Sequence, residues 1–352
     1  MIILTIKYVD VCNAGPKAVG DIINILKKKY KDKIEEKTIE VHQNYYDNNG
    51  LKSVIRKIIN HMKRIIALIE LNTKKDLKII QYPVAKFFFI TKLIPKKNSI
   101  AIIHDLNALR RMDIKKEKKE IQYLDKFKIL IAHNEKMKEY LVQNGISEDK
   151  IKVLELFDYL VEESQEENER NNDTKLDIDY VGNLTKSKSS FIYEINNDEM
   201  NFNLNLYGQG YEKDVNQKFH INYKGTFLPD ELPNKLEGNL GLVWDGKLDE
   251  TDEKNKYKNY TRYNNPHKLS CYIAAKKPVI VWKKAAVADL VQKYNIGYTI
   301  SSLYDINKIN LSKYEEKKKN VEKLSEKVRK GYFTQRVFDE ILEDMQNQNN
   351  VK

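Results

Sequence analysis

The chain has 352 residues, of which 41% are hydrophobic and 32% charged, so its length fits about two domains with a full core each. The net charge of +11 is spread along the chain without an RNA- or DNA-binding motif, which argues against a nucleic-acid partner. A positive charge of this size is also compatible with peripheral contact with an anionic membrane surface. Cys12 and Cys271, the two cysteines, exclude a disulfide scaffold and fit a reducing cytoplasm. The apolar start is too short for a signal peptide, so we expect a cytoplasmic protein.

Strands and helices alternate along the first half, which predicts a parallel sheet. A tight loop is predicted at residues 13–17, after the first strand. The expected domain covers residues 1–158. Its predicted strands are 2–8, 37–42, 77–81, 99–104, 127–132 and 152–155, and its predicted helices are 19–29, 51–69 and 135–143.

Residues 159–177 are acidic and polar, which predicts a linker or exposed loop before a second Rossmann-like domain at 178–328. Within that domain, the charged and tyrosine-rich segment 246–264 is a candidate mobile lid. Two final helices, broken near Gly331, are expected between residues 314 and 345, and the segment 329–352 forms the C-terminal helix. The predicted strands of this half are 176–181, 204–207, 221–224, 241–244 and 279–282, with a helix at 285–294.

The segment 262–282 reads as a polar loop, an amphipathic helix and a short buried strand. The loop carries Asn265 and His267, and Lys268 follows at the start of the helix. A helix N-terminus presents unpaired N–H groups and a positive dipole end, so it suits a bound anion, and Lys268 adds a full charge. The alternative is a plain helix–strand unit whose loop is polar because it is exposed.

Other polar residues follow predicted strands, at the end where ligands of open α/β sheets bind. Asn183, Thr185 and Lys186 come after the strand 176–181, and Asp245 follows the strand 241–244. Each is a candidate for contact with a bound ligand, although Asp245 could simply begin a loop. Tyr207, at a strand end, either borders a nucleobase or is a core tyrosine.

Gly15 and Lys17 are a further candidate pair, because a glycine turn lets backbone N–H groups approach a diphosphate or another ligand. The alternative is a plain helix start with Pro16 near its first position. The Gly-x-Gly-x-x-Gly fingerprint is absent, which argues against a nicotinamide dehydrogenase.

His104 and Asp105 also follow a strand and are the catalytic candidates. Transfer to a hydroxyl needs a group that takes its proton, and an Asp or His in reach provides one. The alternative is that Asp105 caps a helix that begins at Leu106. The other histidines lack metal-ligand spacing, so no metal site is predicted.

Several segments, in order, resemble the bacterial accessory glucosyltransferases that extend the first GlcNAc on serine-rich repeat adhesins. They also resemble the related galactofuranosyltransferases of surface polysaccharide clusters. The segments are Ile103-His104-Asp105-Leu106, Tyr180-Val181-Gly182-Asn183, Ile221-Asn222-Tyr223, Gly241-Leu242-Val243-Trp244-Asp245, residues 268–281 and residues 329–336.

This resemblance implies an α/β GT-B fold: two Rossmann-like domains with parallel sheets that face a cleft, and a C-terminal helix that crosses back. It implies a UDP-sugar donor, a glycan or glycoprotein acceptor, a tetramer and no cofactor or metal. The resemblance makes the ligand-contact candidates above donor-binding residues: Gly15, Lys17, Asn183, Thr185, Lys186, Tyr207, Asp245, Asn265, His267 and Lys268. Lys186, or its neighbour Lys188, then stands where the family places a basic residue against the diphosphate. Asn264-Asn265-Pro266-His267 is nearer the galactofuranosyl branch, so the transferred sugar stays open, as does inversion or retention. A non-catalytic UDP-sugar-binding or scaffold protein is the alternative of another class.

Overall fold

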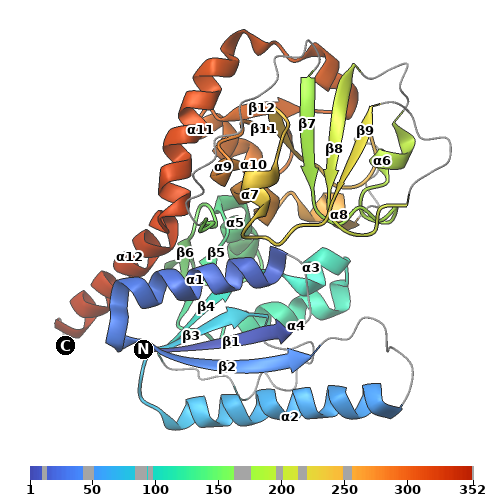
Figure 1. Ribbon diagram of the computed structural model, residues 1–352. Helices are drawn as coiled ribbons and strands as arrows, with labels where there is room; N and C mark the ends of the chain where they lie inside the picture. The colour runs from blue at the N-terminus through green and yellow to red at the C-terminus, as the bar shows by residue number, and fades with distance from the viewer. Residues whose placement is uncertain are drawn as a thin grey trace. The chain divides into compact units, whose positions relative to one another are not determined.

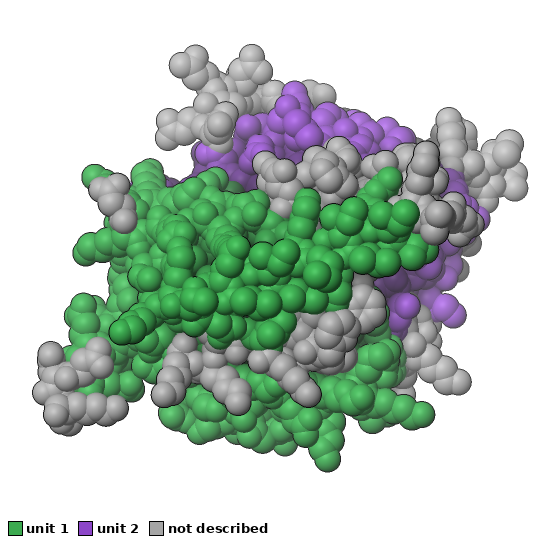
Figure 2. All heavy atoms as spheres, turned by 90° about the horizontal axis from the view of Figure 1, so that it is seen from below, with its two compact units in different colours: residues 1–11, 19–155, 334–352 green, residues 12–18, 156–333 purple. Residues whose placement is uncertain are grey.

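The computed structural model describes residues 1–9, 14–42, 51–83, 93, 98–161, 176–195, 201–212, 220–248 and 256–350 (Figure 1). The chain divides into two compact units, which are coloured separately in Figure 2. Unit 1 comprises residues 1–11, 19–155 and 334–352, and unit 2 comprises residues 12–18 and 156–333. Most of the predicted linker, residues 162–175, lies outside the described residues, but Tyr159 is buried within unit 2.

Unit 1 contains, in its described residues, a six-stranded sheet in the order β2-β1-β3-β4-β5-β6 with every pair parallel. The short strands β3 to β5 are buried along their whole length, as expected where helices cover both faces. The strands are β1 (Ile2–Val9), β2 (Glu35–His42), β3 (Lys78–Tyr82), β4 (Ser99–Ile103), β5 (Ile129–Ala132) and β6 (Ile151–Val153). The helices are α1 (Ala14–Tyr30), α2 (Leu51–Thr73), α3 (Asn107–Arg111), α4 (Ile114–Leu124), α5 (Glu135–Gln143) and α12 (Tyr332–Asn350).

Unit 2 repeats this plan, with a parallel sheet in the order β12-β11-β10-β7-β8-β9 among its described residues. Its strands are β7 (Leu176–Val181), β8 (Phe202–Tyr207), β9 (Ile221–Gly225), β10 (Leu240–Val243), β11 (Val279–Trp282) and β12 (Gly297–Ile300). Its helices are α6 (Phe191–Glu194), α7 (Leu232–Lys235), α8 (Lys256–Tyr260), α9 (His267–Ala274), α10 (Val287–Lys293) and α11 (Tyr314–Arg329). The prediction of two α/β units with parallel sheets is confirmed.

The strand order of unit 2 reverses between β7 and β10. From β7 the chain moves outward to β8 and β9, then returns to the other side of β7 and continues through β10, β11 and β12. Connections leave these two neighbouring strands in opposite directions, which opens a crevice at their carboxyl ends. The residues after Val181 and after Val243 therefore border the same crevice.

Two loop predictions are wrong in part. The tight loop expected at 13–17 is not seen at 14–17, because α1 begins at Ala14 and carries Gly15 and Pro16 in its first turn. Proline is tolerated there, since the first four N–H groups of a helix have no partner within it. The candidate lid at 246–264 includes the helix α8, and its residues 249–255 lie outside the described residues.

The last helix of the chain, α12, belongs to unit 1 from Thr334 onward. Arg336 donates to the carbonyl oxygens of Val153 and Leu154, at 3.1 and 3.0 Å, just after β6. Lys152 forms ion pairs with Glu340 and Asp344 at 2.7 and 2.6 Å. The sheet of unit 1 is thus flanked by residues from both ends of the sequence. In the described part of the chain, the helices lack the combination of length and apolarity that a bilayer span requires.

Tyr272 joins α9 to the sheet of unit 2. Its hydroxyl accepts from the Val181 N–H at 2.8 Å and lies 3.0 Å and 3.1 Å from the carbonyl oxygens of Asp179 and Leu242. Its ring covers Gly241, where an added Cβ would come within 2.2–2.5 Å of the ring carbons. The absence of a side chain at Gly241 therefore sets how closely α9 approaches β10.

We expect Gly241→Ala to lower the free energy of unfolding by at least ~1–3 kcal/mol, because it overpacks a buried contact. Gly20→Ala is the matched control, since a Cβ on Gly20 of α1 meets no atom within 4 Å. That change should be neutral or stabilising, as alanine favours a helix. Urea unfolding of both variants checks the prediction, and equal midpoints would contradict it.

Candidate donor site and catalytic residues

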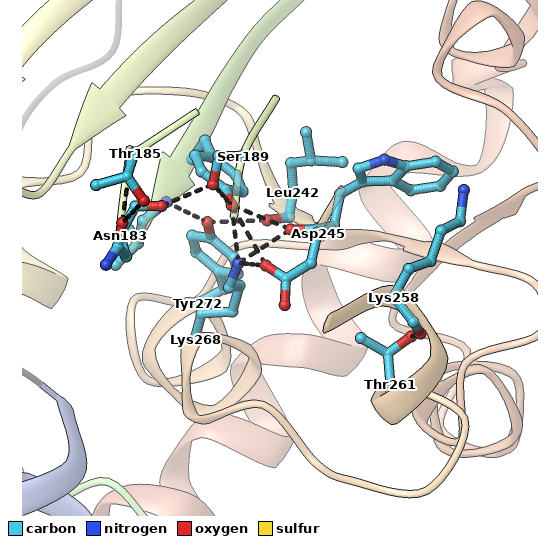
Figure 3. A network of polar contacts seen from close by, with 12 residues as sticks. Asn183, Thr185, Ser189, Leu242, Asp245, Lys258, Thr261, Lys268 and Tyr272 are labelled. Carbon is cyan, nitrogen blue, oxygen red and sulfur yellow. Dashed lines mark hydrogen bonds and ion pairs between the residues drawn. The ribbon is translucent and has the colours of Figure 1, made fainter. Parts of the chain in front are cut away.

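Lys268 is the centre of a polar cluster at the crevice between β7 and β10. It is the second residue of α9, and its Nζ donates to Asp245 Oδ1 at 3.0 Å, to the Trp244 carbonyl at 3.1 Å and to the Tyr180 hydroxyl at 3.2 Å. The ammonium also lies 4.4 Å from the centroid of the Tyr180 ring. Figure 3 shows Lys268 and Asp245 together, with Asn183 and Thr185 close by. Three predicted segments, after β7, after β10 and at the start of α9, therefore meet at one place.

The environment of Lys268 fits a held cation at the edge of the core. The side chains of Lys268 and Asp245 are only 9% and 11% exposed, so the attraction between them is poorly screened by water. Burial raises the pKa of the Tyr180 hydroxyl, which stays neutral and can both donate and accept. Gly182, at φ +143°, passes beside Lys268, and a Cβ there would lie 3.8 Å from Nζ. The ammonium is thus fixed in position, with the β7 loop backbone close to it.

The loop after β7 is organised by Asn183. Its Oδ1 accepts from the Thr185 N–H at 2.9 Å and from the Thr185 hydroxyl at 2.6 Å. Lys186 points elsewhere, since it is exposed and pairs with Glu212 at 3.2 Å. Lys188 is partly buried, with its ammonium 5.7 Å from the Tyr257 ring centroid. The structure brings Asn183 and Thr185 beside Lys268 and gives Lys186 a surface ion pair.

Of the remaining donor candidates of unit 2, Asn265 and Tyr207 are buried and His267 is partly buried. Asn265 is 4% exposed, and His267 stacks on Tyr159 at 4.9 Å between ring centroids. Tyr207 is 1% exposed, and its hydroxyl accepts from the Glu237 N–H at 3.1 Å. Because a ring enclosed in this way cannot stack on a base, the core alternative for Tyr207 is the one that the structure shows.

Lys17 lies in unit 2, beside the Tyr159 ring on which His267 stacks. Its Nζ donates to the Leu160 carbonyl and pairs with Asp230, both at 2.7 Å, and lies 5.0 Å from the Tyr159 ring centroid. Gly15 is part of the first turn of α1, so it does not provide the turn that was predicted. These contacts fix the ammonium of Lys17 beside Tyr159, and its contact with a donor stays a prediction.

His104 and Asp105 follow β4 in unit 1. Gln81 donates to the Val19 carbonyl through Nε2 and offers Oε1 to His104 Nε2 at 2.7 Å, so the imidazole donates at Nε2. Burial lowers the pKa of the His104 imidazole to about 4, and the ring is neutral at physiological pH. Asp105 forms an ion pair with Arg110 at 2.5 Å, with its side chain 30% exposed. Asp105 is the more suitable proton acceptor of the two, because its carboxylate is partly exposed, whereas the Nε2 of His104 is already engaged by Gln81.

The capping alternative for Asp105 is wrong. The N-cap residue of α3 is Leu106, one position after Asp105, and no side-chain hydrogen bond caps the helix there. The first N–H groups of α3, from Asn107 and Ala108, instead donate to the two carboxylate oxygens of Glu120, each at 2.8 Å. Burial raises the pKa of this Glu120 carboxyl, although a hydrogen bond from Tyr82 acts in the opposite direction. Glu120 was not predicted, because it lies on α4, thirteen residues after Asn107.

A second unpredicted feature is the buried Lys258 of α8. Its ammonium lies 4.6 Å from the Trp244 ring and 5.1 Å from the Trp282 ring, measured to the centroids. A small pocket is lined by both tryptophans, Asp245, Lys258 and Thr261, together with Val243 and Ala285. Figure 3 shows Lys258 and Thr261 on the opposite side of Asp245 from Lys268. The described residues contain no group of three or more His, Cys, Asp or Glu side chains able to hold a metal ion.

Comparison with solved structures identifies the class of the fold. The chain resembles Anabaena Alr3699/HepE, whose crystal structure is a complex with UDP, at a TM-score of 0.59 and 9% identity over 98% of this chain and 99% of that one. Two Rossmann-like units of this kind define the GT-B class of glycosyltransferases, which confirms the predicted fold class.

The sequence comparisons identify the family. Residues 1–156 match the glucosyltransferase 3-like N-terminal domain, and residues 178–341 match the C-terminal domain of the same family. The chain therefore belongs to the glucosyltransferase 3-like family and is a glycosyltransferase. It is 32% identical over 302 residues to the beta-1,6-galactofuranosyltransferase WbbI of Escherichia coli K12, which is 81% of this chain and 86% of that protein. It is 30% identical over 138 residues to glucosyltransferase 3 of Streptococcus gordonii, covering 38% of this chain and 40% of that protein.

Proposed function

We propose that this enzyme transfers a hexosyl residue from a UDP-sugar to a hydroxyl group of a glycan acceptor. The observation that carries the proposal is the cluster around Lys268, at the point where the strand order of unit 2 reverses. The names of its relatives and the UDP bound to a structural neighbour support the choice of donor.

In the proposed complex the donor diphosphate lies against Lys268 and the first turn of α9. The three N–H donors of the ammonium point to Asp245, the Trp244 carbonyl and the Tyr180 hydroxyl, so a phosphate oxygen would replace one of these acceptors on binding. Asp245 meets Lys268 through Oδ1, and we assign Oδ2 to a hydroxyl of the transferred sugar. Asn183 and Thr185 supply further polar groups from the β7 loop.

On the acceptor side, we assign Asp105 as the general base. Its carboxylate takes the proton of the attacking hydroxyl while that oxygen bonds to the anomeric carbon and UDP departs, as an inverting displacement requires. His104, neutral at physiological pH, serves as a hydrogen-bonding neighbour. Arg110 fixes the carboxylate of Asp105 without occupying all of its hydrogen-bonding capacity.

The names of the relatives suggest two candidates for the transferred sugar, glucose and galactofuranose. The similarity to the galactofuranosyltransferase covers 81% of this chain, whereas the similarity to the glucosyltransferase of Streptococcus gordonii covers 38%. This difference in coverage favours galactofuranose as the transferred sugar.

A screen of UDP release with UDP-galactofuranose, UDP-galactose, UDP-glucose and UDP-GlcNAc, each with glycan acceptors, tests this proposal. We expect acceptor-stimulated release to be greatest with UDP-galactofuranose. Release that is greatest with UDP-glucose would assign the glucosyl branch instead. UDP binding without turnover of any donor, across glucosyl, galactosyl and GlcNAc acceptors, would support the non-catalytic alternative.

We also propose a cytoplasmic homo-oligomer, a tetramer by resemblance to the family, that works at the inner face of the membrane without cofactor or metal. The two widely separated cysteines support the compartment, and the charge of +11 supports contact with anionic lipid.

A further inference from the structure

The exposed apolar side chains of the described residues gather on one helix, α2. Seven large apolar residues of α2 are each 47–56% exposed, whereas other exposed apolar side chains in the described part of the chain are scattered. We call these seven the α2 stripe: Val54, Ile55, Ile58, Ile59, Met62, Ile66 and Ile69. Singly exposed apolar residues need no explanation, but a contiguous group of this size marks an interaction surface.

The α2 stripe is one continuous face of the helix. Its members recur at intervals of three and four residues, so they lie along a single side. The residues with which α2 packs on its own unit, Ala67, Leu68 and Leu71, are 3% exposed or less and fall on the other side. In Figure 1 α2 runs below the sheet of unit 1 at its β2 edge, and contacts between α2 and β2 agree with this placement. The helix therefore has two apolar faces, of which one is covered by its own unit.

The charges of α2 identify the partner. The helix contains five basic residues (Lys52, Arg56, Lys57, Lys63 and Arg64) and one acidic residue. That residue, Glu70, already pairs with Lys37. By helical spacing, Arg56 and Lys63 lie along one border of the α2 stripe, and both are at least partly exposed. An apolar face bordered by Lys and Arg is the pattern of a helix that lies in the interface of an anionic bilayer.

A second copy of the chain is the competing partner. The spacing of Ile55, Ile59, Met62, Ile66 and Ile69 also fits the seam of a paired helix. Pairing of two such helices would bring their basic borders close together. Each helix has five basic residues and one acidic residue to offset them. Repulsion of this kind opposes pairing, whereas anionic headgroups remove it.

We propose that α2 docks this enzyme on an anionic lipid surface, with the α2 stripe in the headgroup region and Arg56 and Lys63 on lipid phosphates. This gives the membrane association proposed above a defined surface. It also fits the proposed function, because an acceptor carried by a lipid would be held at the same surface.

Vesicle co-sedimentation of the full chain tests the proposal without any donor or acceptor. We expect binding to vesicles that contain phosphatidylglycerol, at least tenfold weaker binding to pure phosphatidylcholine, and loss of binding as salt is raised. Ile59→Glu with Met62→Glu should lower binding to the anionic vesicles at least tenfold. Ile114→Glu is the matched control, because Ile114 is 81% exposed on α4 and should leave binding unchanged.

Failure of the proposal is distinguishable from failure of the enzyme. UDP affinity, measured on each variant without vesicles, reports the donor site in unit 2, and urea unfolding reports the folding of unit 1; neither should change. Wild-type protein that stays in the supernatant with anionic vesicles would overturn the proposal. So would an oligomer that the double Glu variant dissociates in light scattering without vesicles, which would assign the α2 stripe to a second copy.

Discussion

Asp105→Asn should lower kcat by ~10²- to 10⁴-fold and leave UDP affinity nearly unchanged, because the amide cannot take the acceptor's proton. The melting temperature should move little. The ion pair that the change removes is partly exposed, with 30% of the Asp105 side chain and 41% of the Arg110 side chain accessible, and such pairs contribute ~0–1 kcal/mol. Turnover with the correct acceptor, UDP calorimetry and thermal melting together measure the three quantities.

Arg110→Gln is the matched control for the loss of Asp105. It removes the same ion pair and keeps the carboxylate, so kcat should fall far less than in Asp105→Asn. His104→Gln should cost less turnover than Asp105→Asn, since the ring is neutral and already hydrogen-bonded to Gln81. Wild-type kcat in Asp105→Asn would show that the carboxylate is not the base.

Lys268→Met should raise the UDP dissociation constant by about 10- to 150-fold, since a charge-assisted hydrogen bond contributes ~1.5–3 kcal/mol. Methionine keeps an apolar stem against the Tyr180 ring and removes the charge. Isothermal titration of UDP into the folded variant measures the change. An unchanged dissociation constant would rule out the diphosphate role.

Removal of Lys268 alone leaves the Asp245 carboxylate, 11% exposed, without its ammonium partner. The double variant Lys268→Met with Asp245→Asn therefore accompanies the single one, because it removes both charges and avoids an uncompensated one. Lys186→Met is the matched surface control. Lys186 is exposed and pairs with Glu212, so its loss should change UDP affinity by less than Lys268→Met does.

Local sequence pattern was sufficient for most of the fold. The bounds of α5, β7 and β11 coincide with those predicted, and the break at Gly331 separates α11 from α12, because each is fixed by signals within a few residues. The start of α1 was missed for the opposite reason. Gly15 and Pro16 are turn formers in isolation, yet both are also compatible with the first turn of a helix.

The residues of the candidate site that follow the end of a strand could be predicted from the sequence. Contacts between residues far apart in the sequence could not. Lys268, Asp245 and Asn183 each follow a recognisable boundary, and the parallel topology brings them together. No local signal indicated that Glu120 would bind the start of α3, or that Lys258 would lie between two tryptophan rings. Lys17 illustrates the same limit, since its ion-pair partner, Asp230, lies more than two hundred residues away in the sequence.

The membership of α12 in unit 1 bears on how the protein can be divided in the laboratory. A fragment that stops at residue 156, where the family's N-terminal domain ends, lacks the Arg336 guanidinium that binds the Val153 and Leu154 carbonyls. It also leaves Lys152 without both acidic partners. Expression of the first half alone is thus a poor route to an isolated unit 1. Supplying the terminal helix in trans as a peptide, or fusing it ahead of Met1 by circular permutation, would restore these contacts.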